Sequence, residues 1–126
     1  MKSYILDSNI ILRYIVQENT PANIKARQYF EQANNDQLTL VIDNIVVAEV
    51  VWVLKSFYKA PKEDIYNSLK IILTHKNIIM TNKKLILETL EYYYTHNLSY
   101  IDCYLHCLAK AKNLSLATFD KKLSKI

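Results

Sequence analysis

Four carboxylates in this sequence stand beside apolar residues rather than among other polar ones. Asp7 directly follows a short β-prone run, and Asp120 follows another after one intervening residue, Phe119. Asp102 lies near the start of an amphipathic segment, and Glu49 interrupts the apolar run 45–54. Carboxylates gathered without a cation would repel one another and raise one another's pKa. Because hard oxygen ligands prefer Mg²⁺ or Mn²⁺ to zinc, such a cluster predicts a site for one of these two metals. The metal would activate a water and stabilise the departing oxygen of a phosphate ester.

Each of these acids also has an ordinary structural interpretation. Asp7 and Asp120 can be helix N-caps, and Asp102 completes the capping-box pattern that begins at Ser99. Glu49 is the single charged residue in a run of ten whose other nine are apolar, so a helix there would be buried almost all round. A buried carboxylate needs a cation or a hydrogen-bond network as its partner. The alternatives for Glu49 are a salt bridge to a lysine or a solvent-facing place on a strand.

The elements that must position these acids alternate between strand and helix. Four β-prone runs are predicted to be strands, and helical patterns separate them; the strands are 3–6, 38–42, 77–80 and 114–118. Such alternation requires crossover connections, and therefore a parallel sheet with helices on both faces. Ligands bind at the carboxyl ends of such strands, where Asp7 and Asp120 are expected to lie. In the helix that Ser99 caps, we expect an inward face made of Ile101, Leu105 and Leu108.

Length and composition indicate one globular domain spanning residues 1–126. The chain is 51% hydrophobic and 22% charged, which excludes wholesale disorder. No apolar run reaches the ~18 residues of a membrane span, and Asp7 comes too early for a signal peptide. Cys103 and Cys107 do not make a disulfide framework. We therefore expect a soluble, cytoplasmic protein with no membrane partner.

The sequence contains no glycine, and this absence excludes several kinds of phosphate site. The P-loop, the dinucleotide-binding fingerprint and the glycine-flanked serine elbow all need a backbone without a Cβ. Phosphate chemistry here must therefore use side chains or metals. The formal net charge of +4 favours a polyanionic partner, and it is also compatible with a basic surface that has no function.

Four segments, in this order, resemble PIN-domain ribonucleases, most closely the compact VapC-type toxins of toxin–antitoxin systems. The segments are LDSNIILR at 6–13, AEVVWVL at 48–54, DCYLHCLA at 102–109 and LATFDKKL at 116–123. The resemblance implies a three-layer α/β/α sandwich around a mostly parallel sheet of four or five strands, and RNA cleavage that depends on Mg²⁺ or Mn²⁺. It implies a cognate antitoxin and a homodimer as well. The acidic site that it implies is Asp7, Glu49, Asp102 and Asp120, with Asn9 and Thr118 as supporting polar groups.

The sequence departs from the family pattern at three places. Asp43 stands near the position of a small hydroxyl residue, so it is either a fifth acid near the site or a helix cap. Asn113 replaces a glycine before the last predicted strand, and asparagine tolerates a positive φ nearly as well. Family members usually continue past the position of Ile126 to a fifth strand, so the sequence does not decide whether a fifth strand forms the edge of the sheet.

Basic residues add a weaker prediction. Arg13 follows Asp7 along the predicted helix, and Lys121 and Lys122 follow Asp120, so these three could contact the phosphates of RNA. Solvated surface is an equally good interpretation of all three. The sequence therefore leaves two classes of function: a metal-dependent endoribonuclease, and a non-catalytic PIN-like module that binds RNA or protein.

Overall fold

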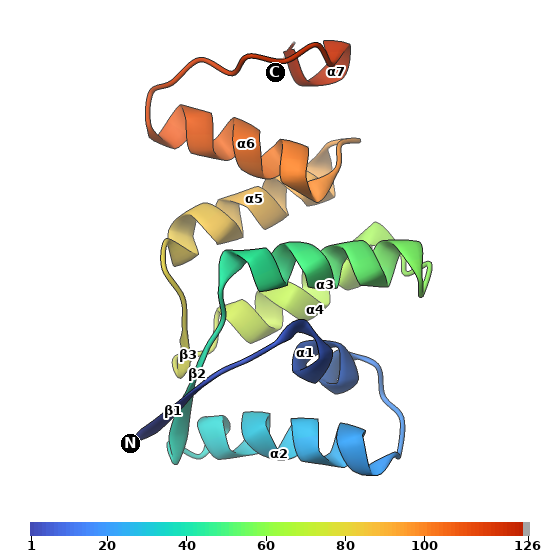
Figure 1. Ribbon diagram of the computed structural model, residues 1–126, viewed down its shortest axis with the longest axis vertical. Coiled ribbons are helices and arrows are strands. Elements are labelled where there is room, and N and C mark those ends of the chain that lie inside the picture. Colours follow the sequence, from blue (N-terminus) through green and yellow to red (C-terminus); the bar gives the residue numbers. More distant parts are fainter. Residues whose placement is uncertain (125–126) are drawn as a thin grey trace. The chain divides into compact units, whose positions relative to one another are not determined.

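Three parallel strands organise the first of the two units into which the chain divides. The computed structural model describes residues 1–124 (Figure 1). Its two units are Met1–Thr81 and Asn82–Ile126, and each is treated separately below. The prediction that residues 1–126 form a single domain stays a prediction.

The sheet of the first unit has the strand order β1-β2-β3, with β2 in the middle. Ile5 pairs with Val41, and Val41 pairs with Ile79, both in parallel. The sequence predicted these three strands and their direction. Their bounds are β1 (Lys2–Ile5), β2 (Leu38–Val41) and β3 (Ile78–Ile79).

Two helices connect β1 to β2, and two more connect β2 to β3. Their bounds are α1 (Ser8–Ile15), α2 (Pro21–Asn34), α3 (Asn44–Ser56) and α4 (Lys62–Leu73). Side-chain oxygens of Asp7, Thr20 and Asp43 accept backbone N–H groups at the starts of α1, α2 and α3, as expected for N-caps. The fully buried side chains of this unit come from both β2 and the helices, and include Leu40, Val47 and Leu69.

One buried amide joins α1 to α2. Asn23 is 1% exposed, and its Nδ2 donates to the carbonyl oxygens of Arg13 and Val16, both at 2.9 Å. The Arg13 guanidinium returns a hydrogen bond to Asn23 Oδ1 at 3.3 Å. These bonds satisfy carbonyls that the end of α1 leaves without helical partners.

The second unit is built on a pair of helices. Its elements are α5 (Lys83–Thr95), α6 (Tyr100–Ala111) and the short α7 (Lys121–Ser124). The apolar face of α5, made of Ile86, Leu90 and Tyr93, is buried. Over residues 1–124, no helix is long and apolar enough to cross a membrane.

The predicted inward face of α6 is wrong. Ile101 is 52% exposed and Leu105 is also exposed, whereas Tyr100, Cys103 and Cys107 are buried. The two stripes lie side by side on the helix and both are apolar enough to pack. Periodicity identifies such stripes but does not decide which of them meets a neighbouring element.

The fourth predicted strand, 114–118, is not a strand within the described residues, so the sheet there has three strands rather than four. The backbone N–H of Leu114 donates to the carbonyl of Ala109 at 2.8 Å, which closes the end of α6. No residue from 114 to 118 joins a strand ladder in the part of the chain that the structure describes. A β-prone run becomes a strand only where another strand accepts its hydrogen bonds, and the run itself does not supply that partner.

In this chain without glycine, four residues in the stretch 1–124 take the left-handed conformation. Asp36, Lys59, Asn82 and Asn113 have φ values between 56° and 61°. Asn113 confirms the prediction that an asparagine takes this conformation where the family has glycine. Lysine is an uncommon residue there, because its Cβ crowds the backbone.

Candidate functional site

Asp7 and Asp43 lie at the carboxyl ends of two adjacent parallel strands. Each follows its strand by two residues, after the paired Ile5 and Val41. Each begins a helix: Ile10 N donates to Asp7 Oδ1 at 3.0 Å, and Ile45 N donates to Asp43 Oδ1 at 2.9 Å. The two acids therefore share the edge of the sheet where α/β proteins bind ligands.

Capping uses only one of the two carboxylate oxygens of Asp7 and of Asp43. Within residues 1–124, the second oxygen of Asp7 and that of Asp43 make no hydrogen bond, and both residues are exposed. An oxygen of this kind is available to a hard cation or to a water. A cap and a metal ligand are therefore compatible roles for one aspartate.

Glu49 is exposed, so the expectation that its carboxylate is buried is wrong. The residue lies in the middle of α3, which confirms a helix and excludes the strand alternative. It forms no ion pair or hydrogen bond within the described residues, which also removes the alternative of a salt bridge to a lysine. It lies six positions after Asp43, or roughly 9 Å along the helix axis.

The exposure of Glu49 follows from how α3 packs. The helix buries Val47, Val50, Val51 and Leu54, and it leaves the opposite face uncovered. Ile45 is 75% exposed and Trp52 is 67% exposed, each one turn from Glu49 on that face. A run of nine apolar residues in ten hides which face packs, so the sequence could not place the glutamate.

Asp102 lies in the first turn of α6 and forms only half of the predicted capping box. Its backbone N–H donates to Ser99 Oγ at 3.1 Å. The reciprocal bond, from Ser99 N–H to the carboxylate, is absent from the described residues. The carboxylate of Asp102 is half-buried and is not committed to the cap.

Asp120 is held by its neighbours in the chain. Its Oδ1 accepts the N–H groups of Lys122 at 2.8 Å and Leu123 at 3.1 Å, and its own N–H donates to Thr118 Oγ1 at 3.0 Å. Thr118 therefore fixes the backbone from which the carboxylate projects. Lys121 and Lys122 are exposed beside it.

The candidate acids divide between the two units. Asp7, Asp43 and Glu49 belong to Met1–Thr81, whereas Asp102 and Asp120 belong to Asn82–Ile126. Over residues 1–124, no three His, Cys, Asp or Glu side chains lie close enough together to hold a metal ion. Joint metal binding by these acids stays a prediction.

Asn9 and Arg13 line a pocket between α1 and α3, which we call the α1–α3 pocket. Arg13 is half-buried, and its Nη1 lies within hydrogen-bond distance of Thr20 Oγ1 and Asn23 Oδ1. The pocket has a volume of about 340 Å³. It is lined by Asn9, Leu12, Arg13, Val16, Glu18, Asn23, Val53, Phe57 and Tyr58. Sequence reasoning missed its two aromatic residues; the signal was an aromatic pair between lysines, directly after a helix.

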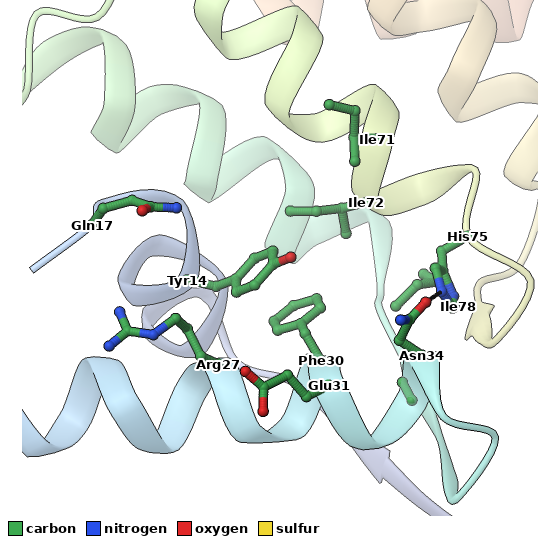
Figure 2. A pocket seen from close by; sticks show the side chains of 11 residues that line it. Tyr14, Gln17, Arg27, Phe30, Glu31, Asn34, Ile71, Ile72, His75 and Ile78 are labelled. Carbon is green, nitrogen blue, oxygen red and sulfur yellow. Dashed lines mark hydrogen bonds between the residues drawn. The ribbon is translucent and has the colours of Figure 1, made fainter.

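A second cavity, of about 450 Å³, lies near the amino ends of the strands (Figure 2). In it the rings of Tyr14 and Phe30 stack with their centroids 3.9 Å apart. His75 hydrogen-bonds to Asn34 at 2.9 Å, where α4 and α2 lead into β3 and β2. This cavity therefore lies at the opposite edge of the sheet from Asp7 and contains none of the candidate acids.

The cysteines and histidine of α6 serve packing. Cys103 and Cys107 are buried, and within residues 1–124 neither forms a disulfide. The ring of His106 lies against Tyr92, with centroids 4.5 Å apart. Burial, followed by the nearby charges of Lys110 and His96, lowers the pKa of His106.

Comparison with known proteins places this geometry in a family. Residues 4–126 match the PIN domain family. A curated relative, the VapC ribonuclease of Aquifex aeolicus (strain VF5), is 24% identical over 123 residues, which cover 97% of this chain and 90% of the relative. With an acid closing the first strand of a parallel α/β sheet and a family match across nearly the whole sequence, the chain belongs to the PIN-domain family.

Proposed function

We propose that this protein is a metal-dependent endoribonuclease, the toxin of a toxin–antitoxin pair, that hydrolyses phosphodiester bonds of RNA. Membership of the PIN-domain family and a relative named as a VapC ribonuclease support the proposal. The observation that carries it is the state of Asp7. This aspartate commits one carboxylate oxygen to α1 and leaves the other uncommitted at the ligand-binding edge of the sheet.

The donor set fits Mg²⁺ or Mn²⁺. We propose Asp7, Glu49, Asp102 and Asp120 as the groups that hold the metal, and each has at least one oxygen without a hydrogen bond in the described residues. All of these ligands are hard carboxylate oxygens, whereas the soft thiols of Cys103 and Cys107 are buried in the packing of α6. When bound, such an ion activates a water and stabilises the oxygen that leaves the phosphate.

The other residues of the proposed site orient its acids or attract the RNA backbone. Thr118 fixes the backbone of Asp120, and Asn9 presents an exposed amide two residues after Asp7. Lys121 and Lys122 supply positive charge for the RNA backbone. Arg13 contributes to phosphate binding only with the part of its guanidinium that Thr20 and Asn23 do not occupy.

We further propose a cognate antitoxin and a homodimer as protein partners. The family and the name of the relative support the antitoxin. The large apolar side chains left exposed on α3, Ile45 and Trp52, support a surface that a protein partner covers.

The test is cleavage of single-stranded RNA by the purified protein with Mn²⁺, with Mg²⁺ and with excess EDTA. We expect cleavage with either metal, none in EDTA, and none from Asp7→Asn or Asp102→Asn. The matched control is Asp64→Asn, which changes an acid in the first turn of α4 and should cleave normally. Full activity in EDTA would exclude the metal mechanism. RNA binding without cleavage under every condition would favour the non-catalytic PIN-like module.

A further inference from the structure

We infer that the α1–α3 pocket is a subsite for single-stranded RNA, in which Phe57 and Tyr58 stack on a base beside the scissile phosphate. The inference rests on the proposed ribonuclease function and adds to it the residues that grip the substrate. Nucleobases of any sequence stack on aromatic side chains, and a basic surface tracks the backbone between them. Phe57 and Tyr58 supply the aromatic rings of the pocket, Arg13 lines it as well, and lysines lie close to the aromatic pair in the sequence.

The aromatic pair is exposed, and hydrogen bonds order the backbone that carries it. Phe57 is 74% exposed and Tyr58 is 44% exposed, and their rings meet edge to face with centroids 5.0 Å apart. The backbone N–H groups of both residues donate to the carbonyl of Val53, at 2.9 and 3.2 Å. The N–H of Ala60 donates to Leu54 at 2.9 Å, which closes the turn behind them. A platform fixed by the backbone loses little entropy when a base stacks on it.

The charge around the pair favours a polyanion. Three lysines, Lys55, Lys59 and Lys62, lie within four residues of the aromatic pair in the sequence, and the acids that flank this stretch are Glu49 and Glu63. Lys59 takes the left-handed conformation next to Tyr58, so a cationic side chain occupies the turn where a small residue would be less strained. The guanidinium of Arg13 lines the same pocket. Glu18 is the acid among the lining residues, and it lies in the segment that follows α1.

The pocket is continuous with the proposed catalytic edge. Asn9 lines it and follows Asp7 by two residues in the same turn of α1. Its volume of about 340 Å³ lies within the ~300–1,000 Å³ range of small-ligand sites, which is room for a base. A strand whose phosphate lies at Asp7 can therefore place a neighbouring nucleotide along α1 toward Phe57.

The experiment measures binding apart from cleavage. Fluorescence anisotropy of an end-labelled, mixed-sequence single-stranded RNA is recorded in EDTA, which keeps the RNA intact. We expect Phe57→Ala and Tyr58→Ala each to weaken binding about tenfold, the effect of losing one stacked base. Tyr58→Phe keeps the ring and should bind as the unaltered protein does. Tyr94→Ala removes an exposed aromatic from α5 and serves as the matched control.

The outcomes separate this inference from the proposed function. If both alanine variants bind and cleave RNA as the unaltered protein does, the subsite is excluded while the ribonuclease stands. If the unaltered protein neither binds nor cleaves RNA, both are overturned. If Tyr94→Ala weakens RNA binding as much as the two pocket variants do, the loss reflects nonspecific binding to exposed aromatic residues. That result would overturn the subsite. Circular dichroism spectra matching that of the unaltered protein show that the variants are folded.

Discussion

The backbone N–H of Leu6 donates to the carbonyl of Val41 at 2.9 Å, so β1 and β2 remain paired almost to the residues that cap α1 and α3. This bond extends the parallel pairing of the two strands toward the segments that carry Asp7 and Asp43. A ligand at this edge therefore meets carboxylates whose backbones the sheet has already positioned, and it does not have to order them itself.

Two substitutions of Asp7 distinguish its role as a helix cap from its proposed role in catalysis. Asparagine caps a helix about as well as aspartate, whereas alanine does not, so Asp7→Ala should lower the free energy of unfolding by about 1 kcal/mol and Asp7→Asn by much less. Both variants should lose RNA cleavage. Urea denaturation and a cleavage assay on the same preparations measure the two effects. Normal cleavage by Asp7→Asn would leave the aspartate as a cap alone.

Glu49→Gln should change cleavage without changing stability. The side chain is exposed and has no partner in the described residues, so the substitution should alter the free energy of unfolding by less than ~0.5 kcal/mol. Cleavage should fall because a metal-binding oxygen is replaced by an amide nitrogen. Thermal melts in EDTA give the first result, with Glu63→Gln as an exposed control. A clear rise in the melting temperature of Glu49→Gln would instead reveal repulsion among gathered carboxylates.

Asn23→Ala should destabilise the first unit by about 2–3 kcal/mol. The substitution leaves the carbonyls of Arg13 and Val16 and the Arg13 guanidinium without their amide partner at a buried position. Chemical denaturation followed by circular dichroism measures the loss. Asn35→Ala, at an exposed residue near the end of the same helix, should cost much less. Equal losses would show that the buried amide contributes nothing specific.

Asp36 predicts a dependence of stability on pH. Hydrogen bonds from Asn77 at 2.7 Å and from Lys76 at 3.2 Å lower the pKa of Asp36 below its ordinary value of 3.8. A carboxyl whose pKa is lower in the folded protein stabilises the fold above pH 3.8, and that contribution disappears as the pH falls through the folded value.

The change that exposes this contribution is Asp36→Asn, because asparagine also tolerates the left-handed backbone at this position. The variant should be less stable than the unaltered protein at neutral pH, and the difference should shrink as the pH falls below 3.8. Urea titrations at the two pH values decide it. If the difference in the free energy of unfolding stays constant with pH, the charge of Asp36 does not cause it.

Local signals made the first unit largely predictable from sequence. Asp7 and Asp43 follow apolar runs and begin helices, and Pro21 is the first residue of α2. These features depend on residues within a few positions of each other, where capping preferences and backbone restrictions act. Features that depend on contacts between distant parts of the chain could not be predicted from the sequence in the same way. Glu49 and Ile101 are exposed because of which helix face meets a neighbour, and residues 114–118 lack a strand partner in the described structure.

The four left-handed residues carry a consequence for how the stability of this protein can be adjusted. A chain without glycine has fewer unfolded conformations to lose on folding, which favours the native state. The same absence makes Asp36, Lys59, Asn82 and Asn113 hold a conformation that glycine would adopt without strain. Introducing glycine at one of them relaxes the folded chain and loosens the unfolded one, so the two effects oppose each other. Because Asn113 is exposed and adjoins none of the candidate acids in sequence, it offers a position where melting temperature and catalytic activity can be varied independently.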